Sequence, residues 1–437
     1  MHNDTGQVYS TEKPKWILAF IFCFLVLLVD GSDMMTLSYS LSSIKAEFGL
    51  DSFQAGMLGS VTLLGMAVGG VFGGWASDKF GRVKAISYSV ISFSLLTGLL
   101  AFVSNVYEFA AVRFLSALGL GTVYMVCAGL IAEYVPTKYR TTVIATLMAG
   151  WTLGYIVASI LAGLIIPEHG WRMLFLVSGS SIIIGILMPI FVKESQSWKQ
   201  EQLDKKLNPS KAVKGENSVF KAMLKDKAVS RTLLFWILAA SFLNFGYYGV
   251  NNWMPTYLEH ELGINFKSMT NFLVGSYTAM ILGKIFAGIL SDKIGRKFTF
   301  IFGSVTTAIF LIIIVMFHNE SNILYLLVAF GFLYGMPMGV YSTYMAESFP
   351  TKLRGTASGT AHNVGRIGST IAPATIGFIA TNGSIGLGFL VMGAAYLICI
   401  LPTFFIKEKM YDPQGNQSAA TEEEKPSTAT KAENKLA

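Results

Sequence analysis

The sequence predicts an all-α integral membrane protein whose twelve transmembrane helices form two pseudo-symmetric bundles of six. Hydrophobic residues make up 53% of its 437 positions and charged residues only 14%, with a mean hydropathy of +0.54, which is too apolar for a soluble protein of this size. Runs of about 20 apolar residues, each long enough to cross the hydrocarbon core as a helix, recur along the chain. Short charged segments also repeat at one fixed offset.

The repeat divides the chain into two related halves. Residues 74–84 (GWASDKFGRVK) resemble residues 288–298 (GILSDKIGRKF), and residues 133–141 (EYVPTKYRT) resemble residues 347–355 (ESFPTKLRG). Matching positions are 214 residues apart in both pairs. A duplicated, apolar, helix-rich chain is typical of a transporter whose two halves rock around a central site.

The apolar runs give the predicted spans in order. In the first half they begin near Trp16, Gln54, Ala85, Tyr107, Thr141 and Arg172, and in the second near Thr232, Met269, Phe298, Asn322, Gly355 and Ile385. The predicted domains are an N-terminal tail at 1–15, a six-helix bundle at 16–193, a Lys-rich linker at 194–231, a second bundle at 232–406 and a polar tail at 407–437. This last tail is too poor in apolar residues to fold alone.

The distribution of cations predicts the orientation. They gather in the loops that follow alternate spans, at Lys79, Arg82, Lys84, Lys138, Arg140, Lys293, Arg296, Lys297, Lys352, Arg354, Lys407 and Lys409. The opposite loops hold mainly Lys45, Arg172 and Lys267, with acids beside them. The positive-inside rule therefore places both termini and the linker in the cytoplasm. The net charge of +7 reports this topology, and cations spread over short loops are unlike a nucleic-acid-binding face.

Several motifs resemble those of a known family. The glycine, aspartate and basic residues of 74–84 and 288–298 resemble the signature loop of the major facilitator superfamily, and Arg113 with Gly119 and Gly121 resembles a second motif of that superfamily. The paired Glu-x-x-Pro-Thr-x-x-Arg runs resemble those of its metabolite and sugar symporters. Asp30-Gly31-Ser32-Asp33 is similar to the DGxD element of the aromatic acid:proton symporter family, in particular its muconate-transporting members.

The resemblance implies the major facilitator fold and a secondary active transporter of the bacterial inner membrane. Its expected activity is proton-coupled uptake of a small organic carboxylate, either an aromatic acid or a dicarboxylate such as cis,cis-muconate, by alternating access. No cofactor is expected beyond the proton gradient. The expected partners are the organic anion, protons and the lipid bilayer, and the protein is expected to be a monomer that binds no nucleic acid.

The charged loops are predicted to act as a gate. Carboxylates at the cytoplasmic helix ends can pair with nearby arginines or cap a helix, and so lock one face of the protein shut. Their place at the membrane surface disfavours contact with substrate. The predicted gating residues are Asp78, Arg82, Asp292, Arg296, Glu133, Arg140, Glu347 and Arg354, with Glu133 and Glu347 expected to pair with Arg140 and Arg354.

Two acids in the first span are candidates for proton coupling. Asp30 and Asp33 are three residues apart and share one helix face, and two adjacent carboxylates inside a membrane cannot both ionise cheaply. At least one is expected to bind and release a proton near neutral pH. Arg113, in the fourth span, either pairs with one of them or extends its side chain to the interface. A purely structural acid pair is the alternative interpretation.

Cations in the second half are candidates for binding the substrate. Arg366 lies near the midplane of the eleventh span and can hold a carboxylate by two parallel hydrogen bonds, with Gly365, Gly368 and Pro373 allowing close approach of backbone and ligand. The family's GRxG element is similar. Lys284 is too deep to reach water and is either a second anion contact or the counter-ion of a buried acid. His362 has three open roles, namely substrate contact, proton relay and packing.

Amides and phenols complete the predicted substrate site. Asn244 occupies the repeat position of Asp30, and Tyr248 follows it on the seventh span, while Tyr155 lies on the fifth. Such side chains suit a planar, conjugated acid, although aromatic residues in membrane helices more often pack or anchor the interface. No nucleophile–base pair, metal cluster or phosphate loop is evident outside the spans, so an enzyme is not predicted.

Two other transport functions compete with the symporter. A proton-driven drug or metabolite efflux antiporter would also use an acid in the first span. The fifth span lacks the Gly-Pro pair of the drug antiporters, however, and Arg366 and Lys284 would repel a cationic drug. An uncoupled facilitator is the third candidate, and uptake that ignores a collapsed pH gradient would identify it.

Overall fold

The computed structural model describes residues 16–406 except 136, 208–222, 224, 320 and 351–352. The predicted tails at 1–15 and 407–437, much of the linker and the side chain of Arg140 lie outside the described residues. The first half forms α1 (Trp16–Phe48), α2 (Ser52–Phe80), α3 (Arg82–Leu99), η1 (Leu100–Phe102), α4 (Val106–Tyr134), α5 (Thr137–Gly179) and α6 (Ile182–Phe191). A short helix of the linker, α7 (Gln196–Leu207), follows.

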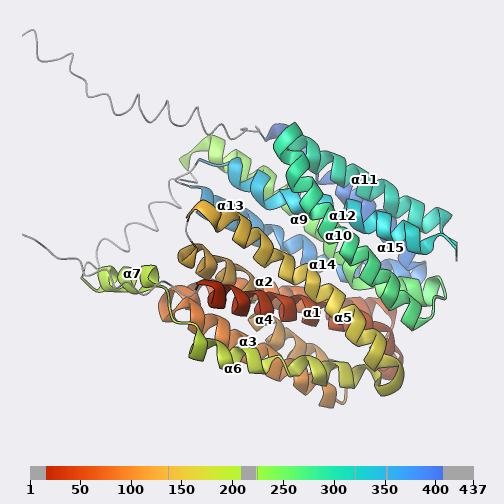
Figure 1. The fold of residues 1–437 in the computed structure, drawn as a ribbon. Coiled ribbons are helices and arrows are strands. Elements are labelled where there is room, and N and C mark those ends of the chain that lie inside the picture. Colours follow the sequence, from red (N-terminus) through yellow and green to blue (C-terminus); the bar gives the residue numbers. More distant parts are fainter. Residues whose placement is uncertain are drawn as a thin grey trace, which may run out of the picture.

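The second half begins with α9 and ends with a 3₁₀ turn. Its elements are α9 (Lys227–Thr256), η2 (Tyr257–Glu261), α10 (Phe266–Ile294), α11 (Arg296–Phe317), α12 (Ile323–Glu347), α13 (Arg354–Gly365), α14 (Ile367–Asn382), α15 (Ile385–Ile398) and η3 (Leu401–Phe405). Figure 1 shows α1–α6 gathered on one side of the molecule and α9–α15 on the other, their axes running in similar directions.

Ten helices of the described residues are long and apolar enough to cross a membrane. One of them, Thr142–Phe191, is 50 residues long and turns sharply at Gly170, whose φ is 74°, so it crosses twice. The chain from Arg354 to Asn382 contains two shorter helices, α13 and α14, that meet at Arg366 and together form one span. These two features reconcile the ten long helices with the twelve predicted spans.

The repeated loops have the same conformation in both halves. Gly81 ends α2 with φ of 109°, and Gly295 ends α10 with φ of 98°, and each is followed directly by the next helix. These values lie in the region that only glycine adopts readily, which explains why glycine recurs at this position of the repeat. We call the end of the molecule with these loops the loop end and the opposite end, near Asp51 and Ser384, the far end.

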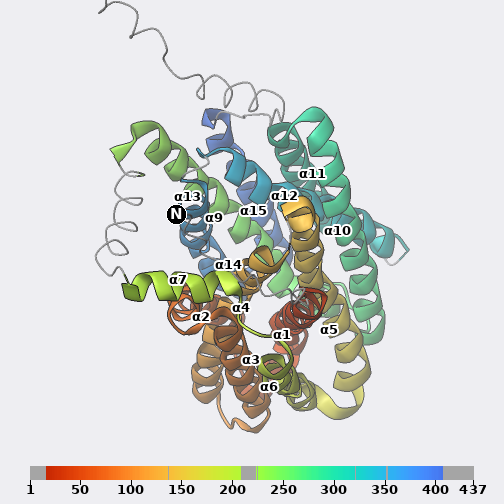
Figure 2. The same ribbon diagram turned by 60° about the vertical axis from the view of Figure 1, so that its left-hand side comes forward.

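The linker helix α7 lies against the loop end of the first bundle, beside the end of α2 (Figures 1 and 2). The side chains of Trp198 and Gln202 donate hydrogen bonds to the Asp78 carbonyl at 3.0 and 2.8 Å. Just before α7, the Glu194 carboxylate accepts a bond from the backbone N–H of Lys84 at 3.1 Å. The predicted linker is therefore helical where it passes this loop.

The two bundles pack tightly at the far end. A Cβ atom at Gly56 on α2 would lie 2.4 Å from the carbonyl oxygen of Pro373 on α14, so the backbones of these helices touch. Nearby, the backbone N–H of Ala374 donates to Ser60 at 3.1 Å. At the loop end, a Cβ atom at Gly355 or Gly359 on α13 would meet nothing within 4 Å. Small residues thus close the far end, and the loop end has open space beside α13.

Candidate functional site

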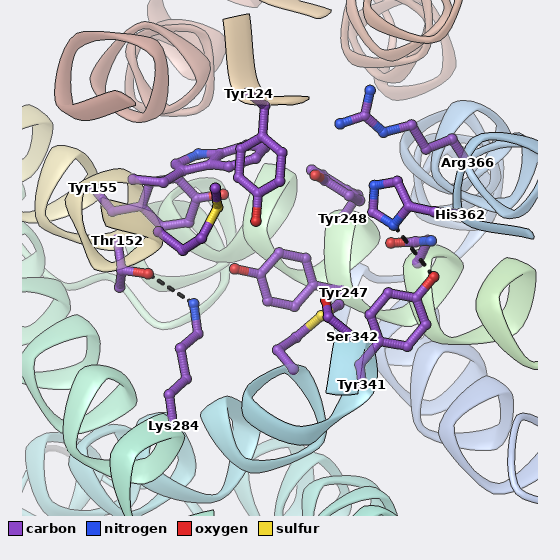
Figure 3. Close-up of a pocket in the computed structure, with 14 residues that line it drawn as sticks. Tyr124, Thr152, Tyr155, Tyr247, Tyr248, Lys284, Tyr341, Ser342, His362 and Arg366 are labelled. Carbon is purple, nitrogen blue, oxygen red and sulfur yellow. Dashed lines mark hydrogen bonds between the residues drawn. The ribbon is translucent and has the colours of Figure 1, made fainter. Parts of the chain in front are cut away.

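A cavity lies between the two bundles, about halfway along the molecule, and encloses about 640 Å³ of empty space including its mouth. Helices of both bundles line it, as Figure 3 shows. Its lining residues are Tyr124, Met148, Trp151, Thr152, Tyr155, Asn244, Tyr247, Tyr248, Lys284, Met338, Tyr341, Ser342, His362 and Arg366. All six predicted substrate residues, Arg366, Lys284, His362, Asn244, Tyr248 and Tyr155, are among them.

Arg366 is held at the break between α13 and α14. Its side chain is only 4% exposed, and its Nη1 atom has no hydrogen-bond partner among the described residues. Gly368 allows this placement because a Cβ atom there would lie 1.8 Å from the carbonyl oxygen of Ser241 on α9. The predicted close approach of backbone is confirmed at Gly368, where the neighbour is helix α9. The guanidinium thus has one buried donor without a hydrogen-bond partner among the described residues, which is costly unless an anion accepts from it.

Lys284 reaches the cavity from α10. Its amine donates a hydrogen bond of 2.7 Å to the hydroxyl of Thr152 on α5, so this bond joins the two bundles (Figure 3). No ion pair of Lys284 occurs among the described residues, and the counter-ion interpretation therefore has no support in the structure. Thr152 is also the residue that occupies the repeat position of Arg366 in the first half. Its hydroxyl thus bonds one of the two cations, Lys284, and stands in the sequence where the second half has the other.

The charged side chains that line the cavity all have the same sign. Arg366 and Lys284 are cationic, and none of the described lining residues is acidic. The two cations lie on opposite sides of the cavity, with the phenol of Tyr247 between them (Figure 3). A cavity with this charge and these walls can hold an anion and would repel a cation.

Five tyrosines are the largest group of side chains in the remaining wall. Tyr247 stacks on Tyr334 with ring centroids 5.0 Å apart and an interplanar angle of 11°. The hydroxyl of Tyr334 donates to the Tyr247 carbonyl at 2.6 Å and accepts from Asn251 at 2.8 Å. These bonds fix the tyrosine pair, so the cavity presents a rigid aromatic surface to a planar ligand. Asn251 supports this wall from behind and does not line the cavity.

His362 lies one turn before Arg366 and faces the same cavity (Figure 3). Its Nδ1 atom is 3.4 Å from the hydroxyl of Tyr341, and its Nε2 atom is buried without a partner among the described residues. This unfilled ring nitrogen suits substrate contact or proton relay better than simple packing. The structure leaves both of these roles open.

The two acids of α1 have different surroundings. Asp33 accepts a bond of 2.7 Å from Nη1 of Arg113 and one of 2.8 Å from Thr97, and Arg113 also donates to the Asp33 carbonyl at 3.1 Å. Arg113 is fully buried, so it does not extend to the interface. Its Nε atom is 3.2 Å from the hydroxyl of Thr62. Asp33 and Arg113 thus form a buried, well-bonded ion pair, as one of the two predicted arrangements requires.

Asp30 is the acid without a partner. It is completely buried, and neither carboxylate oxygen has a hydrogen-bond partner among the described residues. Asp33, Arg366 and Arg113 are the charged groups close enough to act on it electrostatically. A buried carboxyl without hydrogen bonds is far easier to protonate than one held by an arginine. Of the two predicted proton-binding residues, Asp30 is therefore the one whose carboxyl is not held by a hydrogen bond among the described residues.

The predicted gating residues form the same cluster at the loop end of each half. Arg82 pairs with Asp78 at 2.7 Å and with Glu133 at 3.1 Å. In the second half, the equivalent pairs of Arg296 are Asp292 at 2.6 Å and Glu347 at 2.9 Å. Each cluster ties together three helices of its own bundle, and these pairs do not bridge the two bundles.

One predicted pairing of the gate is wrong. Glu347 pairs with Arg296, and no ion pair between Glu347 and Arg354 occurs among the described residues. Arg296 is the first residue of α11, and the turn at Gly295 directs it toward the end of α12. Likewise, Glu133 pairs with Arg82, while the side chain of Arg140 is outside the described residues.

Neutralising the clusters should affect motion more than binding. We expect Asp78→Asn and Asp292→Asn to slow turnover in proteoliposomes, because each removes one of two carboxylates that hold an arginine between helix ends. The cost in stability should be about 0.2–1 kcal/mol, as for other exposed pairs. Substrate titration of the purified variants measures affinity separately. Loss of binding by Asp78→Asn with unchanged cysteine accessibility would make the loop a substrate site.

The repeat also contains a signal for lining residues other than the six predicted substrate residues. Three pairs of lining residues are 214 positions apart, namely Tyr124 with Met338, Met148 with His362, and Thr152 with Arg366. Projecting each predicted site residue onto the other half would have found Met148 and Thr152. Tyr247, Tyr341 and Ser342 have no lining counterpart at this offset, and their place depends on how the two halves pack.

Comparison with known proteins agrees with this architecture. The family model described as Major Facilitator Superfamily matches residues 23–283 and residues 260–434. The cis,cis-muconate transport protein of Acinetobacter baylyi is 59% identical over 401 residues, which are 91% of this chain and 96% of that protein. The gentisate transporter of Corynebacterium glutamicum is 28% identical over 396 residues, covering 88% and 86%. A crystal structure of a D-xylose-proton symporter is similar in fold, with a TM-score of 0.73 and 20% identity over 90% of this chain and 98% of that one.

Proposed function

The chain belongs to the major facilitator superfamily, and we propose that it imports a small organic dicarboxylate together with protons. The observation that carries this proposal is the cationic cavity, whose charged lining residues are Arg366 and Lys284. A relative that is 59% identical is named a cis,cis-muconate transport protein, and muconate is a planar, conjugated dicarboxylate. This substrate would place one carboxylate at each cation.

The form of the cavity supports a two-point substrate. Arg366 can bind one carboxylate through two parallel hydrogen bonds, since its guanidinium has a free donor in the cavity wall. Lys284 can bind the second carboxylate as a point charge, either with Thr152 or in its place. The tyrosines between the two cations can pack against the conjugated chain. An aromatic monoacid would use the same walls and only one of the cations.

Proton coupling is assigned to Asp30. Its carboxyl is buried and unbonded, whereas Asp33 is held by Arg113 and Thr97. Arg366 acts on Asp30 electrostatically, so an anion bound to Arg366 changes the field at Asp30 and favours its protonation. Proton and substrate would then bind cooperatively, which is what symport requires. Driven by the proton gradient alone, the transporter needs no cofactor.

The orientation follows from the loops. The cation-rich loop end is assigned to the cytoplasm, together with both termini, by the positive-inside rule. With the far end closed by the contact of α2 with α14, the arrangement is inward-facing. We propose that the protein works as a monomer in the bacterial inner membrane, because each chain contains both halves of its cavity.

The competing transport functions make different predictions. A drug efflux antiporter would need a cavity that accepts cations, which the two buried cations disfavour. An uncoupled facilitator would move its substrate only down the substrate gradient and would ignore pH. Coupling and direction are therefore measured in the same experiment.

Uptake by proteoliposomes tests the proposal. Purified protein should accumulate labelled cis,cis-muconate when the outside is acidic, and a protonophore should abolish accumulation. Protein-free liposomes and liposomes with Asp30→Asn are the controls. Accumulation that persists with the protonophore would refute proton coupling, and failure of every carboxylate to compete with muconate would refute the shared anion site.

Removing Lys284 should separate dicarboxylates from monoacids. We expect Lys284→Ala to weaken muconate binding about thirtyfold, because one buried carboxylate loses its cation, a loss of about 2 kcal/mol. Benzoate binding should change little, since a monoacid needs only Arg366. Lys293→Ala, at the exposed end of the same helix, is the matched control, and competition titrations measure both affinities. Equal losses for both substrates would make Lys284 a structural residue.

A further inference from the structure

A second hollow lies on the outer face of the first bundle, away from the substrate cavity. It runs between α2, α3 and α4 from Lys84 at the loop end toward Ser92, and we call it the outer groove. Its rim is aromatic, with Phe72 65% exposed, Trp75 58% exposed and Tyr88 70% exposed. Because this surface belongs to membrane-spanning helices, the molecules that meet it are lipids.

The floor of the outer groove is built from small residues. A Cβ atom at Gly73 on α2 would lie 2.2 Å from Thr122 on α4, and one at Gly119 on α4 would lie 2.7 Å from the Ser89 carbonyl on α3. These glycines bring the backbones of the three helices together, and both of them line the groove. The result is an apolar channel at the protein surface that is open to the bilayer.

The mouth of the groove is positively charged. Lys84 lines it, and its exposed side chain has no ion pair in the part of the chain that the structure describes. Lys79 lies beside it, with its amine 4.9 Å from the ring centroid of Trp75 and 5.2 Å from that of Phe80. Both lysines are at the helix ends, where the membrane surface is expected. An apolar channel with two lysines at its mouth complements an acyl chain attached to a phosphate group.

The second half of the chain serves as an internal comparison. At the repeat positions of Lys84 and Tyr88 it has Phe298 and Phe302, whose rings stack with centroids 6.3 Å apart. Lys297, the nearest basic residue in sequence, donates instead to the carbonyls at Phe404 and Ile406. The second half thus has aromatic rings where the first half has Lys84 and Tyr88. The cation at the mouth of the groove is therefore not repeated in the other half.

We propose that the outer groove binds an anionic phospholipid from the leaflet at the loop end. One acyl chain lies over Gly73 and Gly119 between α2 and α3, and the phosphodiester lies at the amine of Lys84. Lys79 adds a second positive charge beside the headgroup. This site is separate from the substrate cavity, and the proposal holds whichever anion the protein transports.

Lipid binding to the purified protein tests the proposal. Native mass spectrometry in detergent would count bound phosphatidylglycerol and phosphatidylcholine of the same chain length, added at equal concentrations. The wild-type protein should retain one phosphatidylglycerol in preference to phosphatidylcholine. Lys84→Ala should weaken that binding about fivefold, the effect of removing one cation near an anionic headgroup. Lys293→Ala, at the repeat position of Lys79 in the second half, should leave it unchanged.

A second variant tests the channel apart from the charge. Ser92→Phe keeps both lysines and fills the groove, so it should also remove the preferred phosphatidylglycerol. Thermal unfolding in lipid-free detergent checks that each variant is folded. Equal losses in Lys84→Ala and Lys293→Ala would show general attraction to surface charge and overturn the proposal. Unchanged binding by Ser92→Phe, or equal retention of the two lipids by the wild type, would also overturn it.

Discussion

Replacing Arg366 by alanine is expected to remove carboxylate binding almost completely. The guanidinium is buried with a free donor in the cavity wall, so its loss leaves the bound anion unpaired in a poorly solvated site. The cost should be about 2–5 kcal/mol, a factor of roughly thirty to several thousand in the dissociation constant. Equilibrium titration of the purified protein with muconate and with benzoate measures it, and both substrates should be affected.

The conservative variant and a matched control sharpen this test. Arg366→Lys should recover little affinity, since an ammonium cannot donate two parallel hydrogen bonds to a carboxylate. Arg231→Ala removes an exposed arginine near the start of α9 and should bind both substrates normally. A folded Arg366→Ala protein with wild-type affinity would place the anion site elsewhere and overturn the proposed function.

Asp30→Asn is expected to abolish accumulation driven by the proton gradient. The amide has almost the same shape as the carboxyl but cannot take up or release a proton, so the step that links the two gradients is lost. Exchange of labelled for unlabelled substrate at equal pH should survive, because it needs no net proton movement. Uptake and exchange assays on the same proteoliposomes measure the two quantities, and full accumulation by Asp30→Asn would contradict the assignment.

Asp33→Asn should also stop accumulation, but for a partly different reason. It leaves the fully buried Arg113 without its charge partner, which typically costs 3–5 kcal/mol of stability. The thermal unfolding midpoint should therefore fall in Asp33→Asn and remain near the wild-type value in Asp30→Asn. This contrast separates the proposed proton-binding acid from the acid that organises the helices around it.

The sequence was a good guide to the fold because its signals are local. Apolar runs and the 214-residue repeat located the spans, and the observed helices begin within a few residues of the predicted starts, as at Trp16 and Ile385. The break of the eleventh span at Arg366 was not predicted. Glycines on either side of this arginine are a local signal for it, but the break itself depends on how closely α14 approaches α9.

The sequence predicts which residues line the site better than it predicts which charged residues pair with one another. All six substrate candidates line the cavity, since a charged or amide side chain in an apolar span has few other places to go. Which acid is paired was not predictable, because the spacing of Asp30 and Asp33 puts both on one face and the direction of Arg113 depends on the packing of α4. For the same reason Glu347 has a partner other than its sequence neighbour Arg354.

The two halves of the chain differ in charge at matching positions around the cavity. Asp30 has Asn244 at its repeat position, and Arg366 has Thr152, so each half has an ionisable group where the other has a neutral one. The acid, Asp30, belongs to the first half, and the guanidinium, Arg366, belongs to the second. In the proposed alternating access, one half rocks against the other and the separation of these two charges changes. The proposed proton site and the proposed anion site would then be coupled by the movement of the two halves themselves.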